Sequence, residues 1–355
     1  MTPEQLRELR DQLPPFPGSG PPSSLQSEFC RFYGIDFHDR LPGLDYRVGT
    51  VVSGDYTLAV HRWLQAGAGS NMLLVHGYYD HSGLFDKLIE YGLSRNCNVL
   101  IFDLPGHGLS TGEPATINDF AEYGDAIAAV LAQSQLPRLP LWAMAQSTGG
   151  AALIEFARRH AWPFAAVVLL APLLRPYGWA LGRLTHTLLR PFAQSIERKF
   201  TANSSDEAFL DFLRQDPLQC RRLPVAWVTA MRNWLDSLPP DDLGVGPALI
   251  VQGDADRTVD GRYNIAFYRG LFPGSEVEWL PGAGHQLANE SAPQRQDYLA
   301  SVDAWLVGQG LAPAIAGAGG TAGIPLRELG NYEIRHNPDA VRPGAAAWPH
   351  AGGGG

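Results

Sequence analysis

The sequence lacks several features that would place it in other protein classes. Its 355 residues include 27 Lys and Arg against 36 Asp and Glu, and the basic residues form no concentrated patch. Because nucleic-acid phosphates are bound by clustered Lys and Arg, this argues against a nucleic-acid partner and is compatible with a neutral or cationic small substrate. No uninterrupted apolar stretch reaches the length of a membrane span, and residues 1–20 contain no basic segment followed by an apolar run. We therefore expect a cytoplasmic protein with no integral membrane segment.

Cysteine and internal repetition are also scarce. The three cysteines, Cys30, Cys97 and Cys220, are scattered and form no CxxC pair. This pattern indicates neither a zinc site nor a disulfide framework. No internal repeat is apparent, so the sequence gives no support to a solenoid.

The two ends of the chain differ from its middle in composition. Residues 1–40 begin with a short helical segment, continue with much Pro, Gly and Ser, and indicate an N-terminal extension at the surface. Residues 311–355 are rich in Gly, Ala and Pro with little periodic hydrophobicity, which predicts a disordered C-terminal tail. The chain as a whole is 45% hydrophobic and 18% charged, as is usual for a globular protein.

Between these ends, short apolar runs alternate with amphipathic segments. The runs are "NMLLVHG", "NVLIFDL", "PLWAMAQ", "AAVVLLAP" and "PALIVQG", and helical patterns such as 117–134 and 149–160 separate them. Continuous apolar runs are typical of parallel strands covered on both faces, so we predict an α/β fold with a mostly parallel central sheet flanked by helices. Two earlier runs, "YRVGTVV" and "TLAVHRWL", alternate more and fit an antiparallel edge. The aromatic-rich helical segment 173–240 interrupts the rhythm and divides the core into 41–172 and 241–310.

One serine lies where a predicted strand meets a predicted helix. In "AQSTG", Ser147 directly follows an apolar run and precedes a helical pattern. This is the context of a nucleophile elbow, in which a strained turn exposes the hydroxyl and the helix N-terminus stabilises negative charge. Gly149 supplies a small residue two positions later, while Ala145 stands where Gly is usual. The alternative is a serine that only caps the helix.

An acid and a histidine later in the chain favour a nucleophilic serine. Asp256 in "GDADRTVD" lies just past one predicted strand, and His285 in "PGAGHQLANE" lies on a glycine-rich loop past the next. The chain order serine, acid, histidine fits a catalytic triad. Asp254 and Asp260 stay open as the acid, although the spacing from the strand end favours Asp256.

Other polar residues follow strand ends before the serine. His76, His81 and His107 would each need another chain order to act as the base, so we expect them to be hydrogen-bonded structural residues. Asp103 in "FDLPGHG" is expected to cap a helix or fix a loop.

In these motifs the chain resembles the α/β-hydrolases, and more narrowly the lysophospholipase and monoacylglycerol lipase group, which is also grouped with serine aminopeptidase-like hydrolases. The resemblance rests on "LLVHGYYDHSGLF", "FDLPGHGLSTG", "AQSTG", "GDADRTVD" and "GAGHQLANE", and it spans about residues 45–310.

The resemblance implies a mechanism. Ser147 would attack an acyl carbonyl, His285 would take and return the proton, and Asp256 would orient the imidazolium. This agrees with the chemistry of a serine hydroxyl, which is a poor nucleophile until a base removes its proton. The backbone N–H groups of Tyr78 and Thr148 would form the oxyanion hole. No metal or organic cofactor is implied.

The resemblance also implies a substrate class. We expect hydrolysis of a carboxylic ester, such as a lysophospholipid, a monoacylglycerol or another lipid-like monoester, through an acyl-enzyme. Amide or peptide hydrolysis, acyl transfer and carbon–carbon bond hydrolysis are alternatives on the same triad, because a fold does not determine a function. A binding protein without activity is disfavoured by the complete set of three residues.

Finally, the resemblance identifies residues 173–240 as a helical cap over the site. Trp179 and Trp227 in this segment would either line an acyl pocket or pack the cap onto the core, and the sequence does not decide between the two. Peripheral contact between the cap and a membrane stays open, and nothing in the sequence indicates the oligomeric state.

Overall fold

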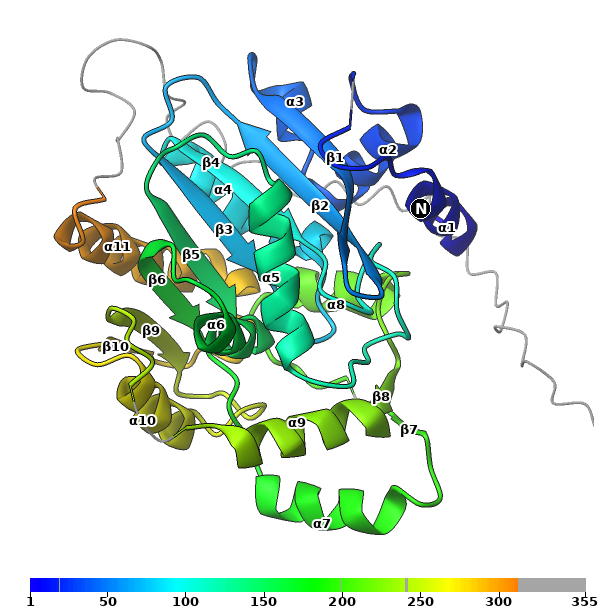
Figure 1. Cartoon of the computed structure of the whole chain (residues 1–355), viewed down its shortest axis with the longest axis vertical. Helices are drawn as coiled ribbons and strands as arrows, with labels where there is room; N and C mark the ends of the chain where they lie inside the picture. The colour runs from blue at the N-terminus through cyan, green and yellow to red at the C-terminus, as the bar shows by residue number, and fades with distance from the viewer. Residues whose placement is uncertain (19, 199, 240–241, 312–355) are drawn as a thin grey trace, which may run out of the picture. The chain divides into compact units, whose positions relative to one another are not determined.

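A computed structural model describes residues 1–18, 20–198, 200–239 and 242–311 (Figure 1). From residue 312 onward, the predicted C-terminal tail lies outside the described residues. An eight-stranded sheet has the order β1-β2-β4-β3-β5-β6-β9-β10, and β7 and β8 form a separate ribbon. The strands are β1 Asp45–Ser53, β2 Tyr56–Leu64, β3 Ser70–Val75, β4 Cys97–Phe102, β5 Leu141–Gln146, β6 Phe164–Leu170, β7 Ser195–Glu197, β8 Arg222–Pro224, β9 Ala248–Gly253 and β10 Glu276–Leu280.

The sheet is mostly parallel, as the continuous apolar runs predict. From β4 through β3, β5, β6 and β9 to β10, each strand is parallel to its neighbour. At the other edge, β1 and β2 are antiparallel to each other, and β2 is antiparallel to β4. The α/β fold with an antiparallel edge is therefore confirmed.

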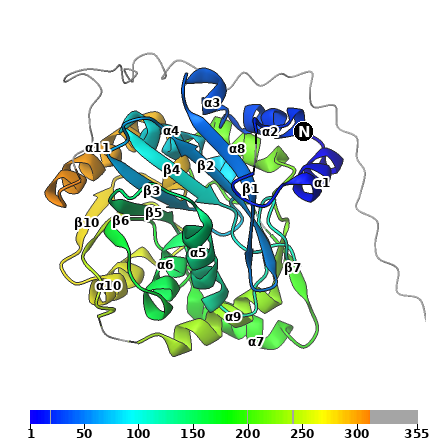
Figure 2. The same ribbon diagram turned by 45° about the horizontal axis from the view of Figure 1, so that its top comes forward.

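Helices cover both faces of the sheet (Figures 1 and 2). In β4, Val99 and Ile101 contact one apolar core, whereas Leu100 and Phe102 contact the core on the opposite face. Because alternate side chains of a strand point to opposite faces, two covered faces require apolar residues at every position. The helices are α1 Pro3–Gln12, α2 Ser24–Tyr33, α3 Phe37–Arg40, α4 Asp86–Ser94, α5 Ala121–Gln133, α6 Thr148–Arg159, α7 Trp179–Leu189, α8 Glu207–Gln215, α9 Val225–Ser237, α10 Gly261–Leu271 and α11 Ala292–Gly308, with short 3₁₀ turns at Ser82–Phe85 and Leu287–Asn289.

The first forty residues, expected as an extension at the surface, form three helices whose apolar faces are buried. Leu6 and Leu9 of α1 and Phe29 and Tyr33 of α2 belong to the same core as the strands. Their spacing of three or four places each pair on one face of its helix. Both α1 and α2 begin with a capping box, in which the cap side chain and a Gln three residues later satisfy each other's backbone N–H groups.

The segment between β6 and β9, called the β6–β9 insertion here, contains α7, α8, α9 and the β7–β8 ribbon. Two indoles of α9 join it to the core: Trp227 Nε1 donates to the Tyr123 hydroxyl at 3.1 Å, and Trp234 Nε1 donates to Glu155 at 2.8 Å. Within the described part of the chain, no helix combines the length and the apolar character that a membrane crossing needs.

Candidate active site

Two loops meet at the carboxyl edge of the sheet. Strand β3 lies between β4 and β5, so the chain leaves β3 toward one side and returns on the other. Open α/β sheets bind ligands at such a switch point. A Cβ atom built on Gly77, in the loop after β3, would lie 3.3 Å from the Cβ atom of Ser147, which follows β5. The backbone of the β3 loop therefore passes directly beside the serine.

Ser147 lies on a sharp turn between β5 and α6. Its φ of 51° and ψ of −112° place a non-glycine residue in a sparsely populated region. A Cβ atom on Gly149 would collide with the carbonyl oxygen of Val75, so the turn brings strand and helix backbones close together. Thr148 is the first residue of α6, where a backbone N–H has no acceptor within the helix and the helix dipole favours negative charge.

The three residues predicted to form the triad are joined by hydrogen bonds. His285 Nε2 lies 2.9 Å from Ser147 Oγ, and His285 Nδ1 lies 2.8 Å from Asp256 Oδ2. The Asp256 side chain is 2% exposed, and Ser147 and His285 are each 6% exposed. The proton of Nδ1 therefore faces the carboxylate, which leaves Nε2 to accept the serine proton.

The two other candidate acids have different partners. Asp254 accepts a hydrogen bond from the Gly282 N–H at 2.7 Å. Asp260 binds the Arg175 guanidinium at 2.7 Å and accepts from the Tyr263 N–H at the start of α10. Among the three acidic residues of this loop, Asp256 is the one that contacts the imidazole.

The charges of the His–Asp pair support each other. Burial opposes ionisation of Asp256, but the charge of His285 and the hydrogen bonds from His285, the Thr258 N–H and Gln252 outweigh it and hold the pKa of this carboxyl below its usual value. Burial likewise opposes protonation of His285, but the charge and hydrogen bond of Asp256, with a smaller contribution from Asp80, raise the pKa of the imidazole above its usual value.

Two glutamines that the sequence analysis did not identify bond to the predicted acid and to the backbone of the predicted base. Gln252 Nε2 donates to Asp256 Oδ2 at 2.9 Å. Gln146 Nε2 donates to the carbonyl oxygen of His285 at 2.9 Å, and Gln146 Oε1 accepts from the Ala288 N–H at 3.2 Å. Each glutamine is the buried polar residue near the end of an otherwise apolar strand, β5 or β9. That exception to the apolar pattern is the signal that could have identified them.

The polar residues expected to be structural are bonded within the fold. His76 Nδ1 lies 2.7 Å from the carbonyl oxygen of Gly77, and His76 Nε2 accepts from the Leu104 N–H at 2.9 Å. The carboxylate of Asp103 accepts backbone N–H groups from Ser82 and Leu109, both at 2.7 Å, and so fixes two loops.

Two more of these histidines are also held inside the fold. His107 Nδ1 lies 2.8 Å from the carbonyl oxygen of Pro105. His81 Nε2 lies 2.8 Å from Asp216 Oδ2 in the β6–β9 insertion. Neither contact involves Ser147.

The two predicted cap tryptophans have different surroundings. The Trp227 ring stacks on Tyr78 with 3.8 Å between ring centres and 19° between planes. The Trp227 side chain is buried. Its stacking partner, Tyr78, is the residue whose backbone N–H is the predicted oxyanion donor. Trp179, at the start of α7, is half-buried against the same apolar core.

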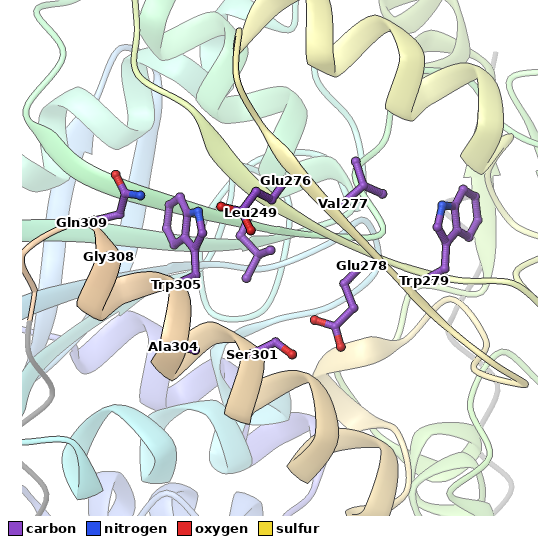
Figure 3. Close-up of a pocket in the computed structure, with 10 residues that line it drawn as sticks. All are labelled: Leu249, Glu276, Val277, Glu278, Trp279, Ser301, Ala304, Trp305, Gly308 and Gln309. Atoms are coloured by element: carbon purple, nitrogen blue, oxygen red, sulfur yellow. The ribbon is translucent and has the colours of Figure 1, made fainter.

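A surface hollow lies away from these residues, and the described residues contain no candidate metal site. A surface hollow of about 680 Å³ lies between β10 and α11, where Trp279, Trp305, Glu276 and Glu278 are among the lining residues (Figure 3). None of the three residues predicted to form the triad lines it. Among the described residues, no group of three or more His, Cys, Asp or Glu side chains is placed to hold a metal ion.

Comparison with known proteins agrees with the resemblance that the motifs indicate. A family model described as serine aminopeptidase, S33, matches residues 68–292. Phospholipase YtpA of Bacillus subtilis is 26% identical over 238 residues, which cover 64% of this chain and 90% of the relative. Monoglyceride lipase of Mus musculus is 27% identical over 263 residues, covering 69% and 84%. In fold, the chain is similar to a soluble variant of monoglyceride lipase from Saccharomyces cerevisiae, with a TM-score of 0.61, 18% identity, and coverage of 75% of this chain and 97% of that chain.

Proposed function

Because the chain belongs to the serine aminopeptidase, S33, family and shares the α/β-hydrolase fold of its lipases and esterases, we propose that it cleaves a lipid-like carboxylic monoester through an acyl-enzyme on Ser147. The observation that carries the proposal is the hydrogen-bonded chain from Ser147 through His285 to Asp256. Such a chain supplies a nucleophile, a base and a group that orients the base.

In the first half of the reaction, Ser147 Oγ attacks the acyl carbonyl while His285 Nε2 takes its proton. Asp256 accepts a hydrogen bond from Nδ1–H and stabilises the imidazolium. His285 then protonates the alcohol oxygen as the carbon–oxygen bond breaks. In the second half, water attacks the acyl-enzyme with His285 again as the base, and the carboxylic acid leaves.

The developing oxyanion needs donors beside Ser147. We assign this role to the backbone N–H groups of Tyr78 and Thr148, which lie in the β3 loop and at the start of α6. One donor of this kind is worth about 3 kcal/mol in the transition state. Stacking of Trp227 on Tyr78 supports the position of that loop.

The proposed substrate is a lysophospholipid, a monoacylglycerol or a similar monoester, in keeping with relatives named phospholipase and monoglyceride lipase. We assign no metal or organic cofactor to the reaction, and the cytoplasmic location remains a prediction. Trp179 and Trp227 are proposed to line the acyl site in the β6–β9 insertion, which we propose as a cap.

Helix α7 supports peripheral contact with a lipid surface. Leu181, Leu184 and Leu188 follow one another at three or four residues on one helix face, are 57% to 69% exposed, and lie near the 87% exposed Phe192. Exposed apolar side chains of this spacing, with Arg183 on the same helix, suit an anionic interface. Replacing Leu184 with Asp is expected to reduce binding to phosphatidylglycerol-containing vesicles, and unchanged sedimentation with the vesicles would contradict this contact.

The proposed function is tested with p-nitrophenyl esters from acetate to palmitate and with the Ser147→Ala variant. We expect a medium or long acyl optimum in the wild type and a fall in kcat of about 10⁴-fold or more in the variant. An optimum at acetate would contradict a lipid-like substrate. If a fluorophosphonate labels Ser147 but no ester is turned over, the proposed reaction would change from ester cleavage to amide or carbon–carbon bond hydrolysis.

A further inference from the structure

A cluster of arginines lies beside the loop that carries the proposed oxyanion donor. The guanidinium carbon of Arg198 is 3.9 Å from the centre of the Tyr79 ring. The Tyr79 hydroxyl donates to the carbonyl oxygen of Arg222 at 3.3 Å, and the Arg198 N–H donates to the carbonyl oxygen of Arg221 at 2.9 Å. Tyr79 directly follows Tyr78, so the Arg198 guanidinium lies beside the loop of the proposed oxyanion donor, and Arg221 and Arg222 contact the same stretch through their backbone carbonyl oxygens.

The position of the Arg198 guanidinium is determined by several neutral groups. Gln219 Oε1 accepts from Arg198 Nη1 at 2.9 Å, while Gln219 Nε2 donates to the carbonyl oxygen of Tyr79 at 2.9 Å. The carbonyl oxygen of Cys220 accepts from the same Nη1 at 3.3 Å. On another side, the Phe200 ring centre lies 4.4 Å from the guanidinium carbon. The single Gln219 side chain thus ties Arg198 to the oxyanion loop.

The same stretch of the β6–β9 insertion lies against the loop of the proposed base. The carbonyl oxygen of Asn203 accepts from the Gln286 N–H at 2.8 Å, directly after His285. Ser204 Oγ donates to the carbonyl oxygen of Asn289 at 2.7 Å. Arg198 therefore belongs to a segment that contacts both the oxyanion loop and the histidine loop.

None of the three guanidinium groups forms an ion pair with a carboxylate of the described residues. Their hydrogen-bond acceptors are neutral: Arg221 donates to the Arg214 carbonyl oxygen and Arg222 to Ser195. By contrast, Arg214 pairs with Asp211. Arg198 is half-buried and the other two are exposed. Half-burial makes an uncompensated cation costly, and an anion that reaches it would offset this cost.

The neighbouring carboxyl, Asp80, makes its hydrogen bonds to groups other than the arginines. Asp80 follows Tyr79, but its two oxygens accept from Gln286 Nε2 at 2.7 Å and from the Gly77 N–H at 3.2 Å. Burial raises the pKa of the Asp80 carboxyl, and its charge acts on Arg198 through space without a direct contact. In addition, residues 173–240 contain nine basic and six acidic residues, although the whole chain has 27 against 36. The segment therefore has a net positive charge in a protein whose net charge is negative, which favours anions near it.

We propose that Arg198, with Arg221 on the same Phe200 ring, binds an anionic head group of the ester substrate. This inference rests on the proposed function and narrows it to monoesters whose alcohol carries a phosphate or a carboxylate. The acyl part of such a substrate is apolar, so the charge must belong to the alcohol. A guanidinium suits this role because its planar N–H groups bind phosphate or carboxylate oxygens in pairs.

The first test compares two esters with the same acyl chain, 1-oleoylglycerol 3-phosphate and 1-oleoylglycerol. The Arg198→Gln variant is expected to raise KM for the phosphate ester by about tenfold or more, because a charge-assisted hydrogen bond is lost. KM for the neutral ester should change by a much smaller factor. Arg214→Gln, which removes an arginine paired with Asp211 in the same insertion, is the matched control. Equal effects of Arg198→Gln on both esters would overturn the inference.

A second test needs no turnover and so separates the two proposals. Binding of 1-oleoylglycerol 3-phosphate to Ser147→Ala protein is measured by calorimetry with and without Arg198→Gln. We expect a Kd about tenfold higher in the double variant, with a smaller increase for Arg198→Lys, which keeps the charge. An unchanged Kd overturns the inference even if esters are cleaved. Competition by inorganic phosphate at the same concentration as the ester would reveal a free-anion site and overturn the head-group assignment.

Discussion

The molecule contains two buried His–Asp pairs with the same separation and different surroundings. His285 and Asp256 lie 2.8 Å apart, as do His81 and Asp216. Both carboxylates also accept a hydrogen bond from a neutral side chain, Gln252 for Asp256 and Tyr33 for Asp216. The pairs differ in the hydrogen-bond partner of the second nitrogen of the histidine ring.

In the first pair, the second nitrogen of His285 faces Ser147 Oγ, and Ser147 and His285 are each 6% exposed. In the second, the Gly83 N–H donates to His81 Nδ1 at 3.2 Å, and neither side chain of the pair is exposed. A nitrogen that already accepts a backbone N–H cannot take a proton from a substrate or nucleophile. The partner of the second nitrogen, and not the His–Asp contact, therefore separates a proposed base from a structural residue.

The largest effect is expected from a substitution that breaks the His285–Asp256 pair. His285→Ala removes the base, and we expect kcat for the best p-nitrophenyl ester to fall by about 10⁴- to 10⁶-fold. The free energy of unfolding should fall as well, because Asp256 loses a buried partner, although it retains its bonds from the Thr258 N–H and from Gln252. Steady-state kinetics and thermal unfolding of the same preparation measure both quantities. A variant with nearly full activity would show that another group is the base.

The same substitution in the second pair should act on stability. His81 is fully buried and joins the β3 loop to Asp216 of the β6–β9 insertion, which also contacts Tyr33 of α2. Breaking a buried pair of this kind costs about 3 to 5 kcal/mol. For His81→Ala we therefore expect the Tm to fall by roughly 10 °C, with activity largely kept at low temperature. A loss of kcat as large as that of His285→Ala, in folded protein, would place His81 in the reaction instead.

The sequence predicts the first pair and misses the second for a physical reason. Asp256 and His285 each follow a parallel strand, and the carboxyl ends of parallel strands lie at one edge of the sheet, so both are expected at the same edge as Ser147. Asp216 follows α8 in the β6–β9 insertion, 135 residues from His81. No periodic pattern relates these two positions. Their contact depends on how the insertion packs on the core.

The strands and the elbow were predictable because they depend on local pattern, whereas the role of the first forty residues was not. Pro, Gly and Ser between α1 and α2 suggested a surface segment, yet Leu6, Leu9 and Phe29 are buried. The capping boxes at Thr2 and Ser23 were the local sign of two ordered helices. The acid and base supports Gln146 and Gln252 were visible as polar exceptions in apolar strands, but their partners depend on the tertiary fold.

A smaller effect, on the pH dependence of kcat/KM, is expected for changes in the first pair. The raised pKa of His285 means that kcat/KM should fall as the pH drops through a value above that of an ordinary imidazole, because the protonated ring cannot act as a base. Gln252→Met removes a donor that stabilises the Asp256 carboxylate. The more basic carboxylate then favours the imidazolium, so we expect the acid limb to move to higher pH by roughly half a unit to one unit. A limb that stays in place would show that Gln252 does not tune the pair.

The smallest expected effect is the matching change in the second pair. Tyr33→Phe removes the hydroxyl that donates to Asp216 Oδ1 at 2.8 Å, while Asp216 keeps its bonds from His81 and the Leu218 N–H. We expect a loss of about 1 to 2 kcal/mol in the free energy of unfolding, measured in urea. The pH profile of kcat/KM should remain that of the wild type, since this donor supports a pair that exchanges no proton with Ser147. A shift of the acid limb by Tyr33→Phe would mean that the two pairs are electrostatically coupled across the β3 loop.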